Sequence, residues 1–352
     1  MLNEFESNLD NEQESNSTLY AVAMESIKKY IKIYLDLAKE TKGFAVVEVQ
    51  HIQTYEHKLI ILAGISSNLD AVKVSAEAVV QEWERRQALI FDVEKSVTQG
   101  VYLKMREVAG EMITQLRQST NDFQDLDVNY IQQNPQMLPI LQRLANIRSK
   151  SELKKQIGSV SDNSISKTAS EKLLNLIKRE QSKKNLEDNA ILQSIEPTLE
   201  GIVRDLVGRV LLESIVMAAL DEAQIPYKKE SQYKSLKGVL YDFRADFVIP
   251  DENHPKAFIE VRKSSSRHAS LYAKDKMFSA INWKGRHKDI LAILIVDGEW
   301  TEETLRVMAN VFDYVVPIKT VSTVVNSISQ YLHGDKSKLK WLIDFSIKPA
   351  NE

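Results

Sequence analysis

Residues 241–262 read YDFRADFVIPDENHPKAFIEVR, and this stretch decides the fold of the C-terminal half of the chain. Two runs rich in aromatic and β-branched residues, Tyr241–Ile249 and Ala257–Val261, have the composition of strands. The residues between them, PDENHP, supply the proline, aspartate and asparagine that turns use. The stretch therefore predicts an antiparallel hairpin.

Segments on either side of this hairpin alternate between helix and strand patterns. Thr198–Glu222 is apolar on one face and ends before Pro226, which predicts a helix. Residues 290–298, ILAILIVDG, form a continuous apolar run of the kind found in strands buried on both faces. The remaining expected elements are helices at Tyr272–Trp283, Glu302–Val311 and Val321–Leu332 and a strand at Asp313–Ile318. This order predicts an α/β (α+β) domain, with a mixed sheet flanked by helices.

Helical periodicity dominates the N-terminal half. Apolar residues recur at helical spacing in Leu19–Lys42, Ala71–Ile90, Tyr102–Leu116 and Pro135–Ile147. Two further apolar runs, Phe44–Gln50 and Lys58–Ala63, are too short to assign. We therefore expect a disordered tail at 1–17, a mainly helical N-terminal domain at 18–150, a connector at 151–195, the α/β domain at 196–335 and an extension at 336–352. The connector is rich in Ser, Lys and Asn, and we expect in it a short helix at Glu171–Lys178.

Composition excludes several kinds of chemistry. The chain has 352 residues and no cysteine, which removes disulfides, thiolate metal sites and thiol nucleophiles and is compatible with the cytoplasm, where we expect the protein to act. Its six histidines lack the spacing of a zinc site, and no glycine-rich phosphate loop is present, so we expect no nucleotide cofactor. No secretory signal and no apolar run of about 20 residues is visible, so we expect no membrane partner.

Charge is distributed unevenly along the chain. The net charge is only −3, yet residues 256–289 hold nine Lys and Arg residues against three acidic residues. A local basic excess of this kind is what the phosphate backbone of a nucleic acid attracts. The alternative is a solvated basic face without a partner.

The predicted hairpin carries one acidic residue on each strand. Alternation of side chains puts Asp246 on one face with Val248, and Glu260 on one face with Phe258 and Arg262. Antiparallel pairing can bring the two carboxylates together, where they repel unless a cation such as Mg²⁺ lies between them. Each acid can instead face solvent, although Glu260 lies in an otherwise apolar strand, where an unpaired carboxylate is costly.

The stretch ADFVIPDENHPKAFIEVR resembles the core of the PD-(D/E)-x-K nuclease superfamily, and most of all type II restriction endonucleases. The resemblance covers about residues 196–332 and implies a restriction-endonuclease-like sheet. Asp246 matches the Asp of the motif, with Ala245 in place of its Pro, and Glu260 matches the second acid. The resemblance implies that Asp246 and Glu260 bind Mg²⁺.

The lysine of the motif is replaced in this chain. Arg262 stands in its position, and arginine hardly ever loses its proton, so it can orient water or stabilise charge but is a poor base. Lys263 is adjacent but points to the other face of a regular strand. Lys274 or Lys276, from the following helix, can also reach the site.

Family members often add an acid from the helix before the hairpin. Glu213 interrupts the apolar pattern of that helix and fits this role, and it fits equally well as a residue at the edge of the apolar face. Asp205 is the alternative.

The segment after the second strand is expected to contact DNA. Its hydroxyl and basic side chains suit phosphate contacts, and Asn282 or Arg286 can read base edges. The expected DNA-binding residues are Ser264, Ser266, Arg267, His268, Lys274, Lys276, Asn282 and Arg286.

The expected function is hydrolysis of double-stranded DNA by a Mg²⁺-dependent, type II site-specific endonuclease. A palindromic target requires two catalytic domains, so we expect a homodimer, with the N-terminal half wrapping DNA or dimerising. Two alternatives stay open. One is a non-catalytic DNA-binding protein on a nuclease-like fold, which the Lys-to-Arg departure motivates. The other is a repair or recombination nuclease.

Overall fold

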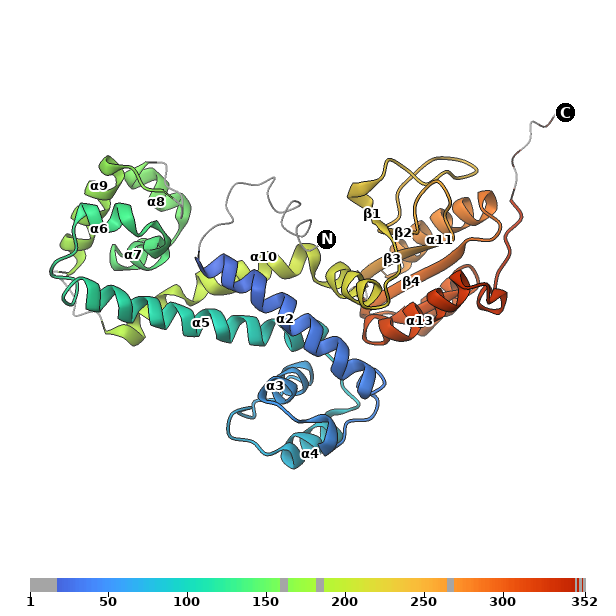
Figure 1. Ribbon diagram of the computed structural model, residues 1–352, viewed down its shortest axis with the longest axis horizontal. Helices are drawn as coiled ribbons and strands as arrows, with labels where there is room; N and C mark the ends of the chain where they lie inside the picture. Colours follow the sequence, from blue (N-terminus) through green and yellow to red (C-terminus); the bar gives the residue numbers. More distant parts are fainter. Residues whose placement is uncertain are drawn as a thin grey trace. The chain divides into compact units, whose positions relative to one another are not determined.

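The computed structural model of the protein describes residues 18–158, 164–181, 187–264, 269–345, 347 and 350 (Figure 1). The tail expected to be disordered, 1–17, lies outside them. The chain divides into two compact units, one comprising the residues up to Tyr30 with Val97–Arg209, the other Ile31–Ser96 with Val210–Glu352. Within the described ranges, no helix has the length and apolar character needed to cross a membrane.

The first unit is helical. Its elements include most of α5 (Val93–Ser119), then α6 (Val128–Gln133), a 3-10 turn η2 (Pro135–Met137), α7 (Leu138–Leu144), α8 (Lys150–Ile157), α9 (Lys167–Gln181) and the first part of α10 (Asp188–Glu222). The last three occupy most of the expected connector. The α9 helix packs against α6, α7 and α8, and buries Leu173 and Ile177. Sparse but regularly spaced apolar residues are therefore sufficient for helices here. We expected one short helix in this connector, and the structure has more helix than that.

The helices that end before residue 97 are α2 (Thr18–Glu40), the 3-10 turn η1 (Val49–His51), α3 (Tyr55–Gly64) and α4 (Ala76–Arg86). Of these, α2 and α4 match expected helices with shifted ends, whereas η1 and α3 overlap the two runs that the sequence left unassigned. The α4 helix begins five residues later than expected, because the Ser75 side chain accepts a hydrogen bond from Ala78 N and caps it. Residues 31–96 group with the sheet rather than with the other N-terminal helices. One contact that joins them is the ion pair between Glu94 and Lys263.

The second unit contains a mixed sheet, as the sequence predicts, with five strands, of which the first was not expected. Its strands lie in sequence order: β1 (Lys228–Lys229), β2 (Phe247–Ile249), β3 (Ala257–Ser264), β4 (Leu291–Gly298) and β5 (Tyr314–Pro317). The β1–β2 and β2–β3 pairs are antiparallel, and the β3–β4 and β4–β5 pairs are parallel. The expected hairpin is therefore present. Its turn is tightened by Asp251 Oδ1, which accepts hydrogen bonds from the backbone of Asn253 and His254.

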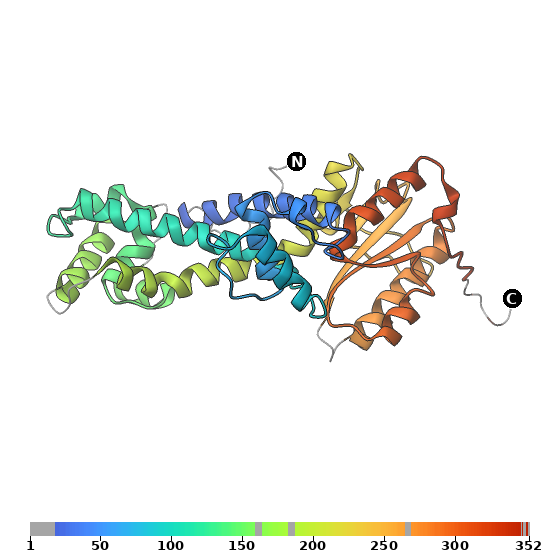
Figure 2. The ribbon, with the colours of Figure 1, turned by 90° about the horizontal axis from the view of Figure 1, so that it is seen from below.

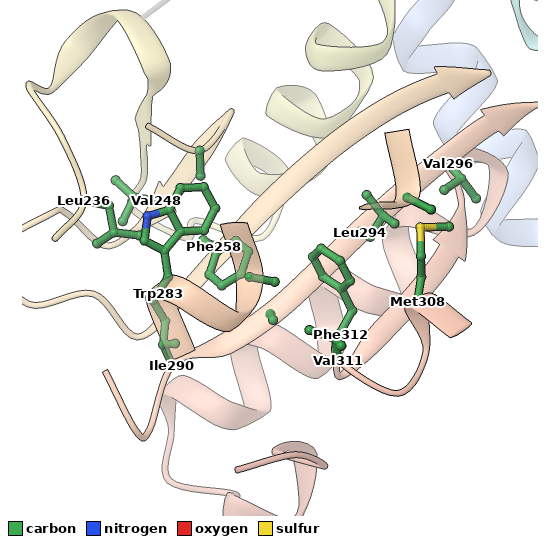
Figure 3. Close-up of a cluster of buried hydrophobic side chains, with 14 of the residues drawn as sticks. Leu236, Val248, Phe258, Trp283, Ile290, Leu294, Val296, Met308, Val311 and Phe312 are labelled. Atoms are coloured by element: carbon green, nitrogen blue, oxygen red, sulfur yellow. The ribbon is translucent and has the colours of Figure 1, made fainter. Parts of the chain in front are cut away.

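Helices cover both faces of the sheet (Figure 2). One face carries α11 (Ala269–Arg286) and α12 (Glu302–Met308), and the other carries α13 (Val321–Leu332). The remaining 3-10 turns are η3 (Glu230–Gln232), η4 (Ile318–Thr320) and η5 (Lys336–Lys338). On the first face Phe258 and Leu294 pack with Trp283 of α11 and Met308 of α12 (Figure 3). Every residue from Leu291 to Val296 is buried, which confirms the expectation for β4.

The expected first strand is much shorter in the structure. Only Phe247–Ile249 pair as β2, and the residues before it form a loop with one isolated bridge, Leu236 to Phe243. Asn282 of α11 binds this loop, accepting from Leu240 N and donating to Tyr241 O. A side chain at Gly238 would overlap the Asn282 amide, so a glycine is required for this close approach.

Candidate active site

The hairpin brings Asp246 and Glu260 together in a buried position. Phe247 pairs with Ile259, so the residues next along each strand, Asp246 and Glu260, face each other across the hairpin. Asp246 is 7% exposed and Glu260 is fully buried. The backbone N–H of Val261 donates a 2.6 Å hydrogen bond to Asp246 Oδ2, which fixes this carboxylate against β3. The expected convergence of the two acids is thus present in the structure.

Tyr233 holds the residue that precedes Asp246. Its hydroxyl donates to Ala245 O at 2.8 Å and accepts from Ala245 N at 2.5 Å. Burial raises the pKa of the Tyr233 phenol, so it stays a neutral donor. Sequence reasoning missed this residue, because nothing in its local pattern indicates a partner twelve positions away.

The guanidinium of Arg262 bridges the two acids. Its Nη1 atom donates to Asp246 Oδ2 at 2.9 Å and to the Val261 carbonyl at 2.6 Å. Its Nη2 atom lies 3.1 Å from Glu260 Oε2. Three oxygen atoms, from two carboxylates and one peptide carbonyl, therefore converge on a single cationic group. Arg262 therefore lies against both acids, and its side chain is 28% exposed.

Lys276 approaches the same site from α11. Its Nζ atom lies 2.9 Å from Glu260 Oε2, and the residue is 7% exposed. One of the two lysines expected on this helix thus reaches Glu260, whereas Lys274 is exposed to solvent. The sequence could not separate them, because the choice depends on how α11 is rotated against the sheet.

Both oxygens of Glu260 remain poorly satisfied despite these cations. Among the described residues Oε1 has no hydrogen-bond partner, and Oε2 has Arg262 and Lys276 within ion-pair distance without a hydrogen bond of good geometry. Burial, followed by the charge of Asp246, raises the pKa of Glu260 to about 8, and the two cations oppose this shift. A buried carboxylate with unused acceptor capacity is an unfavourable structural feature but a suitable ligand for a hard cation.

Glu213, on α10, adds a third acidic group to this neighbourhood. Burial, followed by the charge of Asp246, raises the pKa of Glu213 to about 7, and Arg262 and Lys229 oppose the shift. The structure thus places Glu213 within electrostatic reach of Asp246. Asp205 is exposed and belongs to the other compact unit. No group of three Asp, Glu, His or Cys side chains among the described residues is arranged closely enough to hold a metal ion by itself.

The remaining expected site residues lie in different surroundings. Lys263 points to the opposite face of β3 and pairs with Glu94. Ser264 and Asn282 are buried, and the amide of Asn282 is engaged with the loop at 240–241, so neither side chain faces solvent. Arg286 is exposed. Ser266, Arg267 and His268 lie outside the described residues.

Comparisons with protein-family models, with curated proteins and with solved structures found no match to this chain.

Proposed function

We propose that the protein is a Mg²⁺-dependent endonuclease that hydrolyses phosphodiester bonds of double-stranded DNA, of the sequence-specific type II restriction kind, on a restriction-endonuclease-like sheet. One observation carries the proposal. Asp246, directly before β2, and Glu260, on β3, are held together in a buried position with a cation in contact with both. Two carboxylates so close to each other are unfavourable without a compensating positive charge.

The chemistry of this donor set fits Mg²⁺. The carboxylates of Asp246 and Glu260 and the carbonyl of Val261 are hard oxygen donors that already surround one cationic group, and Glu260 Oε1 has no hydrogen-bond partner among the described residues. Asp246 and Glu260 would hold the metal, with Glu213 near enough to add negative charge. A bound Mg²⁺ supplies Lewis acidity and lowers the pKa of a coordinated water.

Lys276 is the residue that we assign to the role of the motif lysine. It is buried against Glu260, whereas Arg262 retains its proton at all working pH values. The ammonium of Lys276 orients Glu260 and stabilises negative charge that develops on the phosphate. Tyr233 and the Val261 N–H fix the position of Asp246 while this occurs.

Exposed basic residues of α11 supply the contacts to DNA. Lys274 and Arg286 are exposed on this helix, which is the helix that carries Lys276. They suit phosphate oxygens, which position a protein on a duplex without reading its sequence. Cleavage of a palindromic site would require two copies of the chain, so the proposal includes a homodimer.

A second candidate rests on Arg262. If this guanidinium holds the two acids together permanently, no metal enters, and the protein binds DNA without cutting it. Purified protein incubated with varied genomic DNA in Mg²⁺ or in EDTA separates the candidates. Discrete fragments in Mg²⁺ alone support the type II enzyme, and a smear with the same dependence indicates a repair-type nuclease. Intact DNA, together with a gel shift that survives EDTA, rejects the proposal in favour of the binding protein.

A further inference from the structure

Two cationic groups lie against the acids of the candidate site before any metal arrives. Asp246 and Glu260 provide two carboxylates, and Arg262 and Lys276 provide two cationic groups in contact with them. A divalent cation entering this arrangement would bring two more positive charges next to two existing ones. Buried like charges at such separations repel by several kcal/mol at an effective dielectric constant of about 20. One of the two basic side chains must therefore move away.

Arg262 is the group that can leave. It contacts the same three oxygens that a cation would use, and 28% of its side chain is exposed, so it has a direct path to solvent. Lys276 contacts only Glu260 among the site oxygens, and its side chain is 9% exposed. The more exposed cation, in direct competition for the oxygens, is displaced at the lower cost.

A second acidic partner for Arg262 lies nearby. Burial lowers the pKa of Arg262, but the charges of Glu260, Asp246 and also Asp275 outweigh it and raise this pKa. The Asp275 side chain, on α11, is 67% exposed. It already lies 3.7 Å from Lys276 Nζ, and as an exposed carboxylate on α11 it is the group to which we assign the guanidinium after it leaves the site.

We propose that Arg262 is a displaceable counter-cation, which occupies the oxygen-lined position until a divalent cation takes its place and Arg262 moves to Asp275. This inference rests on the cation site of the proposed function. It adds a regulatory consequence: Arg262 keeps the acids assembled without metal, and it sets the metal concentration at which the site fills. The replacement of Lys by Arg is then a device that weakens metal binding rather than a mark of lost catalysis.

Mn²⁺ binding to the full chain tests this inference without reference to DNA cleavage. Free Mn²⁺ gives an electron paramagnetic resonance signal that bound Mn²⁺ loses, so titration yields a dissociation constant. We expect Arg262→Gln to bind Mn²⁺ about tenfold or more tightly than the wild type, which corresponds to about 1.4 kcal/mol. Arg244→Gln is the matched control, since Arg244 is a neighbouring arginine that pairs with Glu230. It should change the constant by no more than about twofold.

Two further variants keep the test decisive. Arg262→Lys retains the charge with fewer donors, so it protects the fold if Arg262→Gln does not fold, and we expect it to bind Mn²⁺ more tightly than the wild type. Asp275→Asn removes the receiving partner and should weaken binding by a few-fold. Equal Mn²⁺ affinity in the wild type, Arg262→Gln and Arg262→Lys would overturn the inference and leave the proposed function intact. If none of these proteins binds Mn²⁺ at a site that depends on Asp246, both this inference and the proposed function are overturned.

Discussion

The ammonium of Lys276 and the carboxylate of Glu260 lie 2.9 Å apart, with both residues almost completely removed from solvent. Buried ion pairs contribute little net stability, because the desolvation of the two charges offsets their attraction. A contribution to stability therefore does not explain this pair well. The proposed function explains it better, because a metal and a phosphate need charged groups already in place.

Lys276→Met should slow cleavage strongly, while Lys276→Arg should retain more of the activity. The first variant removes the positive charge next to Glu260, and loss of one such electrostatic group lowers the rate by about 10²–10³-fold. The second keeps the charge with altered geometry. Single-turnover cleavage rates measure this, with circular dichroism to verify folding and Lys73→Met, an exposed lysine paired with Asp70, as the control. Equal rates in Lys276→Met and the control would remove Lys276 from the mechanism.

The metal-free protein should lose stability as pH rises from about 4.5 to 7, and Glu213 should account for part of this loss. The pKa of Glu213 is raised to about 7 in the folded chain, so the folded state holds this proton more tightly than the unfolded state. Stability from this group is complete below pH 4.5 and declines until pH 7. Glu213→Gln should reduce the loss of unfolding free energy between pH 4.5 and 7 by about 1–3 kcal/mol. Urea denaturation at several pH values in EDTA tests this, and an unchanged slope would contradict it.

Asn282→Ala should destabilise the protein without changing sequence preference. The Asn282 side chain is fully buried and bound to the part-buried backbone groups of residues 240 and 241, so its loss removes these hydrogen bonds at a cost of about 1 kcal/mol for each. Denaturation measures the cost, and the fragment pattern from genomic DNA reports the preference. A stable variant with an altered pattern would show that Asn282 reads bases after all.

Asp313→Ala should cost more stability than Lys284→Met, although the two residues form one buried ion pair. Asp313 accepts from Lys284 Nζ at 2.6 Å and also from the backbone of Ala292, Lys340 and Trp341. Its loss leaves a buried ammonium and three backbone donors unpaired, at about 3–5 kcal/mol. Lys284→Met leaves Asp313 with its backbone donors. Chemical denaturation ranks the two, and the reverse order would contradict this reading of the pair.

Much of the C-terminal fold was predictable because burial there follows simple patterns. The run at 290–296 is apolar throughout, which identifies a strand covered on both faces, and α13 has the expected bounds of Val321–Leu332. The pairing of Asp246 with Glu260 followed from alternation and from the turn at 250–256. These features depend on neighbours in sequence or on a single hairpin.

The remaining features depend on contacts between distant segments. The loop before β2 has strand composition, yet Asn282 of α11 holds it away from the sheet. Lys276 rather than Lys274 reaches Glu260 because of the rotation of α11, which no local pattern specifies. The packing of α9 against three other helices likewise turns a polar stretch into ordered structure.

The central claim is that Asp246 and Glu260 form the metal site of a DNA-cleaving enzyme. It is tested most directly by the rate at which Asp246→Asn cuts long genomic DNA in Mg²⁺, next to the wild type and Asp242→Asn. Asp242 is an exposed acid on the same loop, whose side chain accepts from Gly238 N, a bond that Asn can keep. We expect the wild type and Asp242→Asn to cut DNA at similar rates and Asp246→Asn, although folded, to cut at least about 100-fold more slowly. Undiminished cleavage by Asp246→Asn, or no Mg²⁺-dependent cleavage by the wild type, would contradict the claim.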